Sequence, residues 1–249
     1  MGLPMTLSLI ILTRNESRNI SECLESVEGA DEILVVDDFS DDDTVSLAEN
    51  SGARVLRRKL DSFAGQRNFA LAESRGDWVF FLDADERFSS DLMEMVRVHM
   101  ASGDEGPGSI KRRNFAFGLN HHFGPLKPDR VVRLFKRGSV RWEGAVHERP
   151  VYSGTDKHLN GYLKHLTYRD WDHYLTKQFR YATLWAAEAS ARGRKAGPFK
   201  AVVRGALGFF KMMVLNLGIL GGPVCWALCW YHGAYTLTKY LKLSELNRK

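Results

Sequence analysis

The first hundred residues alternate short apolar runs with stretches of helical periodicity. The apolar runs predict strands at residues 6–12, 33–36, 53–56 and 78–82. The segments between them predict helices at residues 17–27, 43–50 and 63–73. A regular alternation of strand and helix is typical of a mostly parallel sheet with helices on both faces. The pattern therefore predicts an α/β fold.

The second half of the chain has a different pattern. After a helix predicted at residues 91–100, apolar residues alternate with basic or polar ones in short runs at 131–135, 139–142, 145–152 and 162–168. Such alternation favours an antiparallel extension of the same sheet. A long helix is then predicted at residues 170–192. We expect one domain over residues 1–195 and an amphipathic helical tail over residues 196–249.

The tail contains an uncharged run from residue 212 to residue 238. About 20 apolar residues suffice to cross a bilayer, but Gly218, Gly221, Gly222 and Pro223 break this run near its middle. Two shorter helices that lie in the membrane interface fit the pattern, with Trp and Tyr at headgroup depth and Lys and Arg at the flanks. A true or re-entrant span and a buried or dimer-forming hairpin are the alternatives.

Charge is distributed unevenly along the chain. Residues 1–105 carry 10 Lys and Arg against 22 Asp and Glu, whereas residues 106–249 carry 25 against 8. The two parts should therefore meet different partners. The basic residues are dispersed through predicted strands and an apolar tail without a nucleic-acid-binding motif, so we expect no nucleic acid partner.

Composition narrows the class of protein. With 44% hydrophobic and 26% charged residues, the chain is neither disordered nor a fibrous rod. Cys23, Cys225 and Cys229 have the wrong number and spacing for a disulfide framework or a zinc site. The first residues lack the basic segment of a signal peptide. We therefore expect a location in the cytoplasm, in contact with the inner face of the cytoplasmic membrane.

Polar residues follow the predicted strands at the points where these strands end. Thr-Arg-Asn-Glu at 13–16 follows the first strand, Asp-Asp at 37–38 the second, and Asp-Ala-Asp at 83–85 the fourth. Open parallel sheets bind ligands beyond the carboxyl ends of their strands. Carboxylates gathered there would repel each other without a cation. We therefore predict Mg²⁺ or Mn²⁺, held by carboxylates together with substrate phosphates.

Four motifs make the prediction more specific. They are Leu-Thr-Arg-Asn-Glu at 12–16, Val-Val-Asp-Asp-Phe-Ser-Asp-Asp-Asp-Thr at 35–44, Gln-Arg-Asn at 66–68 and Leu-Asp-Ala-Asp-Glu at 82–86. In order and spacing they resemble an inverting glycosyltransferase of family 2 with the GT-A fold. The sequences at 63–71 and 146–148 are most similar to the bacterial glucosyltransferases of the lipopolysaccharide inner core.

The resemblance implies a nucleotide pocket at the first strand ends. Thr13 and Glu16 would line this pocket. Asp38, together with Asp37, would bind the uracil ring. Arg67 would face the base or the diphosphate.

The resemblance also implies a metal site and a general base. Asp85 would be the direct metal ligand, Asp83 would lie near the ribose and the metal, and His147 would complete the metal shell or hold the diphosphate. An inverting displacement needs a base that takes the proton of the acceptor hydroxyl. Glu143 and Glu148 are the candidates, and Glu148 matches the acidic position of the family.

Other conspicuous residues have structural interpretations. Residues 41–43 are expected to stabilise the start of the following helix. His165 and His173 are expected to be satisfied histidines of a sheet and a helix. Trp142 and Trp171 could stack on a sugar, but packing in the core is the better prior.

The implied reaction moves a hexose, glucose by the resemblance, from a UDP-sugar to a lipopolysaccharide core or similar glycolipid. The acidic part would hold the metal and the donor, and the basic part would approach the anionic acceptor. One alternative is transfer to polyprenyl phosphate. Another is a catalytically degenerate protein that binds sugar or lipid without turnover. The pattern makes no prediction of the oligomeric state.

Overall fold

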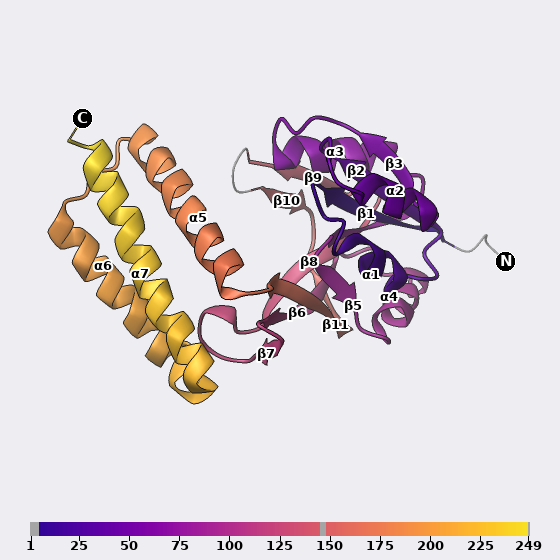
Figure 1. Ribbon diagram of the computed structural model, residues 1–249. Coiled ribbons are helices and arrows are strands. Elements are labelled where there is room, and N and C mark those ends of the chain that lie inside the picture. Colours follow the sequence, from indigo (N-terminus) through magenta and orange to yellow (C-terminus); the bar gives the residue numbers. More distant parts are fainter. Residues whose placement is uncertain (1–4, 145–147, 249) are drawn as a thin grey trace. The chain divides into compact units, whose positions relative to one another are not determined.

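The computed structural model describes residues 5–144 and 148–248 (Figure 1). Its α-helices are α1 (Ile20–Glu25), α2 (Thr44–Asn50), α3 (Phe63–Glu73), α4 (Leu92–Ala101), α5 (Trp171–Ala191), α6 (Pro198–Phe210) and α7 (Gly222–Leu246). Its strands are β1 (Leu7–Thr13), β2 (Glu32–Asp37), β3 (Arg54–Arg57), β4 (Trp78–Asp83), β5 (Glu86–Phe88), β6 (Gly108–Ala116), β7 (Leu119–His121), β8 (Asp129–Lys136), β9 (Val140–Glu143), β10 (Arg149–Tyr152) and β11 (Lys157–Tyr168). Three short helical turns complete the described part: η1 (Gly124–Leu126), η2 (Lys211–Leu215) and η3 (Gly218–Gly221).

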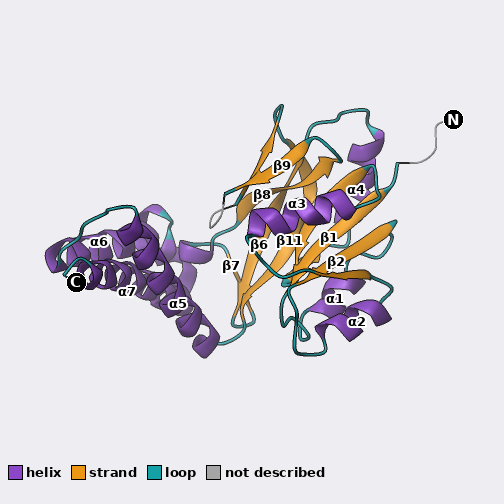
Figure 2. Cartoon of the chain, turned by 90° about the horizontal axis from the view of Figure 1, so that it is seen from above, coloured by secondary structure: helices purple, strands orange, loops and turns teal. Residues whose placement is uncertain are grey.

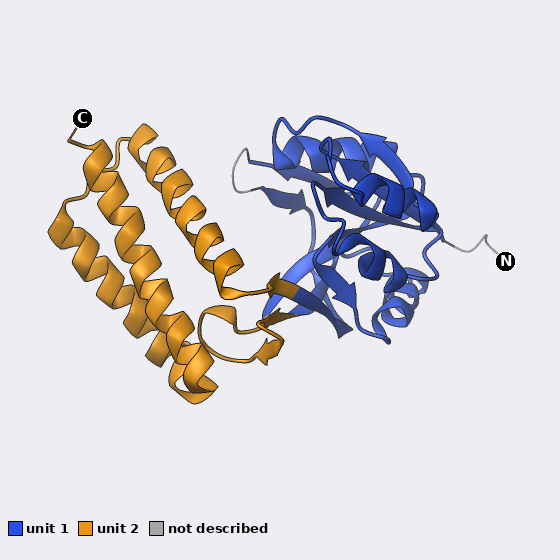
Figure 3. Cartoon of the chain, viewed as in Figure 1, with its two compact units in different colours: residues 1–112, 129–165 blue, residues 113–128, 166–249 orange. Residues whose placement is uncertain are grey.

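The chain divides into two compact units (Figure 3). Unit 1 consists of residues 1–112 and 129–165, and unit 2 of residues 113–128 and 166–249. This division does not coincide with the predicted boundary at residue 195. The reason is that α5 packs against α7 and so belongs with the tail in unit 2.

The main sheet of nine strands has the order β3-β2-β1-β4-β8-β6-β11-β5, with β7 paired to β6. Strands β1 to β4 pair in parallel, and β8 joins β4 in the antiparallel sense. The predicted α/β class and antiparallel extension are confirmed. One detail was wrong, because β9 and β10 form a separate two-stranded sheet. Strand β6 was missed, since its central Lys-Arg-Arg obscures the apolar positions around it.

Helices cover both faces of the sheet because alternate strand residues point to opposite sides. Leu9 and Ile11 of β1 belong to the core that also contains apolar residues of α1, α2 and α4. Ile10, between them, belongs to a second core with α3 and β9. Figure 2 shows α3 lying across the strands. The alternation thus gives unit 1 three layers, with helices on each face of the central sheet.

The strand order reverses at β1, which lies between β2 and β4. Thr13 at the end of β1 is in register with Asp37, and Leu12 is in register with Asp83. The carboxyl ends of the three strands therefore lie at one edge. Ligands of open parallel sheets bind at this kind of position.

Unit 2 contains the three long helices α5, α6 and α7. The predicted break in the tail is confirmed, because η2 and η3 separate α6 from α7. No single helix among the described residues is long and apolar enough to cross a membrane. Residues Pro198–Leu215 and Gly218–Leu246 pass that test only as a pair, and the pair is bent by 68°.

The junction of β1 and β4 gives a test of the fold. A Cβ atom on Gly76 would lie 2.6 Å from the backbone nitrogen of Ser8. We expect Gly76→Ala to lower the free energy of unfolding by about 1–3 kcal/mol, because neither backbone can move away easily. Urea unfolding measures this change. Gly197→Ala is the matched control, since its Cβ meets open space, and an equal loss in both variants would contradict the close approach.

Candidate active site

Asp37 is the last residue of β2 and lies at the carboxyl edge of the sheet. Its carboxylate accepts hydrogen bonds from the hydroxyl of Thr13 at 3.1 Å and from the backbone nitrogen of Ser40 at 2.8 Å. The side chain of Asp37 is fully buried. Asp37 and Thr13 therefore join the ends of β2 and β1 and fix the loop after β2. Their predicted contact with the nucleotide stays a prediction.

Asp38 holds two other segments at the same edge. One of its oxygens lies 2.6 Å from Nη1 of Arg14, and the other accepts a 2.9 Å hydrogen bond from the backbone of Leu60. Asp38 is buried, whereas the Arg14 side chain is 66% exposed. Glu16 is used within its own turn, where it accepts a bond from the Asn19 amide.

The loops after β1 and β2 are connected to each other. The backbone of Asn15 donates to Ser40, and the Asn15 amide oxygen accepts from the backbone of Asp41. Asn15 and Phe39 both have positive φ, at 56° and 50°. Such a conformation is a strained one for a bulky side chain such as Phe39, which is also exposed. The hydrogen bonds between the loops hold both residues in this conformation.

The carboxyl end of β4 carries an ion cluster in which Arg67, Arg133 and Glu86 are buried and the Asp83 side chain is 36% exposed. Asp83 lies between two guanidinium groups, with Oδ2 2.5 Å from Nη2 of Arg133 and Oδ1 3.2 Å from Nη2 of Arg67. Arg133 also contacts both oxygens of Glu86 at 3.0 and 3.1 Å. Arg112 approaches Glu86 at 3.5 Å. The crowded carboxylates at this edge are thus neutralised by arginines of the same chain.

The cluster shifts the pKa values of its two acids in opposite directions. Burial alone would raise the pKa of Asp83, but Arg133 and Arg67 outweigh it and hold that pKa below its usual range. Burial raises the pKa of Glu86; Arg133 opposes this shift and the Asp83 charge adds to it. Glu86 also accepts a hydrogen bond from the backbone of Asp83. Glu86 therefore shapes the turn that presents the acidic motif.

Asp85 lies apart from the arginines. Its Oδ2 is 3.4 Å from Nε2 of His165 on β11. His165 was expected to be a structural histidine, and the structure brings it to the one acidic side chain that the sequence assigns as direct metal ligand. Among the described residues, no group of three or more His, Cys, Asp and Glu side chains could hold a metal ion. His147, the other predicted ligand, lies outside the described residues.

The Gln-Arg-Asn motif of α3 connects this helix to its surroundings. The side-chain amide of Asn68 donates a hydrogen bond to the backbone oxygen of Trp142 and accepts one from its backbone nitrogen, each at 2.9 Å. The guanidinium carbon of Arg67 lies 4.5 Å from the centre of the Trp142 ring. Trp142 is buried in the second core, as expected. Gln66 donates to the backbone of Arg58.

A cavity of about 730 Å³ opens in unit 1 beside Arg67. Its lining includes Asp83, Arg133 and Glu148, with Oε1 of Glu148 3.6 Å from Nε of Arg67. Glu143 does not line it and forms an ion pair with the exposed Arg141. Of the two candidate bases, only Glu148 therefore shares a cavity with the acidic motif.

The sequence predicted Arg67 but not Arg133 and Arg112, the other two basic members of the cluster. Arg133 is a single arginine within the apolar strand Val-Val-Arg-Leu-Phe, and this position was a usable signal. Arg112 gave no comparable signal, because it stands in a run of three basic residues. Glu86 belongs to the motif at 82–86, but no role was predicted for it.

Part of the chain matches a known protein family. Residues 8–122, which contain Asp83, Asp85 and Glu86, match the model of glycosyl transferase family 2. This part of the chain is similar to that family, and the protein is a glycosyltransferase. The glycosyltransferase is 29% identical over 221 residues to the lipopolysaccharide core biosynthesis glycosyltransferase LpsC of Rhizobium meliloti, covering 85% of this chain and 82% of that protein.

One further relative and two solved structures are also similar to parts of the chain. An uncharacterized glycosyltransferase of Rickettsia conorii is 27% identical over 230 residues, which are 84% of this chain and 79% of that one. Among solved structures, mannosyl-3-phosphoglycerate synthase of Rubrobacter xylanophilus overlaps 45% of this glycosyltransferase and 41% of its own chain, with 24% identity and a TM-score of 0.39. Glucosyl-3-phosphoglycerate synthase of Mycobacterium tuberculosis, solved with Mn²⁺ and UDP, covers 46% and 44% with a TM-score of 0.37. The chain thus spans less than half of these solved proteins.

The ion cluster predicts a pH-dependent loss of stability. Arg133→Met removes the cation between Asp83 and Glu86, so burial and mutual repulsion should raise the folded-state pKa of one carboxyl above its unfolded value. A group with a raised folded pKa loses its stabilising contribution as the pH rises through that pKa. We expect a loss of about 3–5 kcal/mol in the free energy of unfolding at pH 8 and a smaller loss at pH 5.5, measured by urea unfolding.

Arg141→Met serves as the control, because Arg141 and its partner Glu143 are both exposed. It should change the free energy of unfolding by less than about 1 kcal/mol at either pH. If Arg133→Met were destabilised equally at both pH values, the carboxyls would not be coupled through Arg133.

Proposed function

We propose that the protein is a metal-dependent inverting glycosyltransferase that moves a hexose, glucose in our reading, from a UDP-sugar to a lipopolysaccharide-core or similar glycolipid. The observation that carries this proposal is the meeting of Asp83, Arg67 and Glu148 at one cavity, with Asp85 beside His165 at the same strand end. The similarity to LpsC supports a lipopolysaccharide acceptor. We place the reaction at the cytoplasmic face of the inner membrane.

Donor binding would use the edge formed by β1, β2 and β4. Thr13, Asp37 and Asp38 stand at the ends of neighbouring strands, and their loops are connected by hydrogen bonds. A uracil ring offers an N–H donor that a carboxylate such as Asp38 can accept. Arg67 carries a fixed positive charge at the side of the cavity where the diphosphate would develop negative charge.

Asp85 and His165 would supply two of the ligands of a divalent cation. Two ligands of one small ion stand about 3 Å apart when each lies at about 2.1 Å from it, and Asp85 and His165 are separated by 3.4 Å. A carboxylate with an imidazole suits Mn²⁺ better than Mg²⁺, which prefers oxygen ligands. When bound, the ion would neutralise charge on the departing diphosphate. Asp83, held by two arginines, would orient the motif rather than carry the ion.

Glu148 is the base that the cavity favours. As a carboxylate on the cavity wall it can take the proton of an acceptor hydroxyl, and Arg67 at 3.6 Å orients it. Glu143 is directed to Arg141 instead. The geometry of the cavity therefore supports the proposal of Glu148, the residue that the sequence also favours.

The role of the base is tested with Glu148→Gln, which keeps the shape of the side chain and removes its basicity. We expect kcat to fall by about 10²- to 10⁴-fold, the usual contribution of general base catalysis, with little change in binding of UDP measured by calorimetry. Glu143→Gln is the matched control and should keep wild-type kcat. Undiminished turnover of Glu148→Gln on a lipid phosphate would instead favour transfer to polyprenyl phosphate.

The metal ligands are tested by titration of activity with Mn²⁺ after treatment with EDTA. We expect EDTA to abolish turnover and Mn²⁺ to restore it. His165→Ala should raise the Mn²⁺ concentration for half-maximal rate by at least about tenfold. His158→Ala is the control, since His158 is mostly exposed and lies near Asp156. Full activity in EDTA would refute the metal-dependent mechanism.

A further inference from the structure

Helix α6 has its large and small residues in an unusual arrangement. The residues that it buries are Ala201 and Gly205. Its large apolar side chains are exposed, and Phe199 is 83% accessible. The remaining exposed apolar residues of α6 are Val202, Val203, Leu207 and Phe210. A helix of a water-soluble protein normally turns its large apolar residues to the core.

The contact between α6 and α7 explains this arrangement. A Cβ atom on Gly205 would lie 2.9 Å from Cβ of Leu237, and one on Gly233 would lie 2.9 Å from Cβ of Phe209. The two helices therefore approach each other through glycines. Small residues between helices and large apolar residues outside are typical of helices surrounded by hydrocarbon. In water the same pair would leave its hydrophobic surface unburied.

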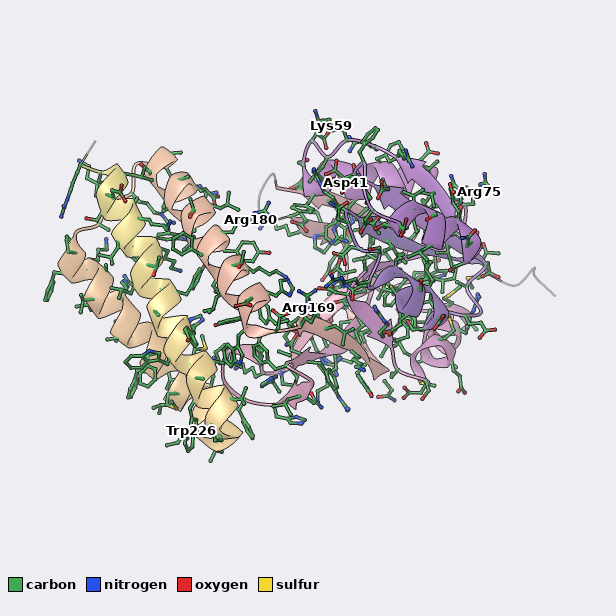
Figure 4. All side chains as sticks on the ribbon, in the orientation of Figure 1. Asp41, Lys59, Arg75, Arg169, Arg180 and Trp226 are labelled. Carbon is green, nitrogen blue, oxygen red and sulfur yellow. The ribbon has the colours of Figure 1, made fainter. Side chains whose placement is uncertain are left out.

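The apolar surface continues around the turn between the helices. Leu215, Leu217, Ile219 and Leu220 are all exposed there, Leu220 at 63%. Trp226, labelled in Figure 4, follows on α7 and donates its indole N–H to the backbone of Ile219 at 2.9 Å. This bond satisfies the polar group of the ring within the protein. The turn thus presents a surface that apolar surroundings would accept.

A groove within unit 2 has room for one hydrocarbon chain. It measures about 630 Å³, and its lining consists of apolar and small residues of α6 and α7 that include Leu207, Phe210, Trp230 and Leu237. No charged side chain lines it among the described residues. Its composition suits a hydrocarbon chain better than a polar ligand.

The charged residues of the tail indicate which kind of membrane surface the α6–α7 pair would contact. Residues 196–249 contain seven Lys and Arg but a single acidic residue, Glu245. None of these charges falls between residues 212 and 238. Lys239 lies over the rings of Trp185 and Tyr235, at 4.7 and 5.2 Å. Basic and aromatic residues that border an apolar segment match an anionic headgroup region.

We propose that the α6–α7 pair enters the hydrocarbon of one leaflet of an anionic bilayer, with the turn at residues 215–220 deepest. The basic and aromatic residues that border the uncharged segment favour hydrocarbon over a second copy of the chain, because they match an anionic headgroup region. The bend at the break excludes a single straight span. This goes beyond the interfacial helices expected from the sequence, and it is independent of the donor, the acceptor and the base.

The test uses the full chain and vesicles of phosphatidylcholine with or without phosphatidylglycerol. We expect flotation with the anionic vesicles, and quenching of tryptophan fluorescence by lipids brominated deep in the acyl chain. Leu220→Asp and Leu207→Asp should each weaken vesicle binding by at least about tenfold, because a carboxylate is costly in hydrocarbon. Val98→Asp is the matched control, since Val98 is equally exposed but lies on α4 of unit 1.

Melting temperatures of the variants in detergent show that they remain folded. Equal vesicle binding by Leu220→Asp and Leu207→Asp would overturn the proposal. So would quenching confined to bromines near the headgroup, which indicates helices on the surface. A stable dimer that Leu207→Asp dissociates, without vesicle binding by the wild type, would assign the surface to a second copy. The fall in kcat expected for Glu148→Gln can be measured with a soluble acceptor analogue. That measurement tests the proposed function separately from membrane insertion.

Discussion

The buried contact between Arg133 and the carboxylates of Asp83 and Glu86 is the interaction on which the candidate active site depends. Asp83 ends β4, Glu86 begins β5, and Arg133 comes from β8. The pair therefore connects the parallel part of the sheet to its antiparallel extension. Burial of these charges is tolerated only because each faces a partner. Removing Arg133 would leave Glu86 with Arg112 alone, at 3.5 Å, at the edge where we propose that the donor binds.

The same contact changes the meaning of the uneven charge distribution. The acidic part of the chain was expected to require a metal ion to relieve its repulsion. Arg133 and Arg112 belong to the basic part, and they neutralise Asp83 and Glu86 directly. The cation would be needed only at Asp85, beside His165. A smaller part of the positive charge is thus available for an anionic acceptor or membrane, and most of what lies in the tail surrounds its apolar segment.

Much of unit 1 could be predicted from the sequence because local signals and tertiary structure agree there. The apolar strands, the turn residues after them and the spacing of the acidic motifs predicted Asp37, Asp38, Asp83 and Asp85 at one edge. The register of β1 with β2 and β4 confirms this for Asp37 and Asp83. Long-range pairings could not be predicted. Nothing local to His165 indicates that β11 would bring it to Asp85, some 80 residues away in sequence. The same holds for Arg133, whose partners precede it by 47 and 50 residues.

The tail shows the limit of reading hydrophobicity alone. Its uncharged run and its break were evident from the sequence, but the side of the helices that faces outward depends on which residues can approach most closely. Gly205 and Gly233 meet in the structure, and the large side chains are left outside. Composition could not distinguish this arrangement from a buried hairpin.

Arginines balance Asp83 and Glu86, and we propose that a cation binds at Asp85 with His165. A crystal structure of the protein with Mn²⁺ and a uridine diphosphate sugar measures this directly. We predict anomalous density for manganese between Asp85 and His165, with Arg133 still in contact with Asp83 and Glu86. Manganese bound to Asp83, with Arg133 displaced from it, would contradict the proposed cation site.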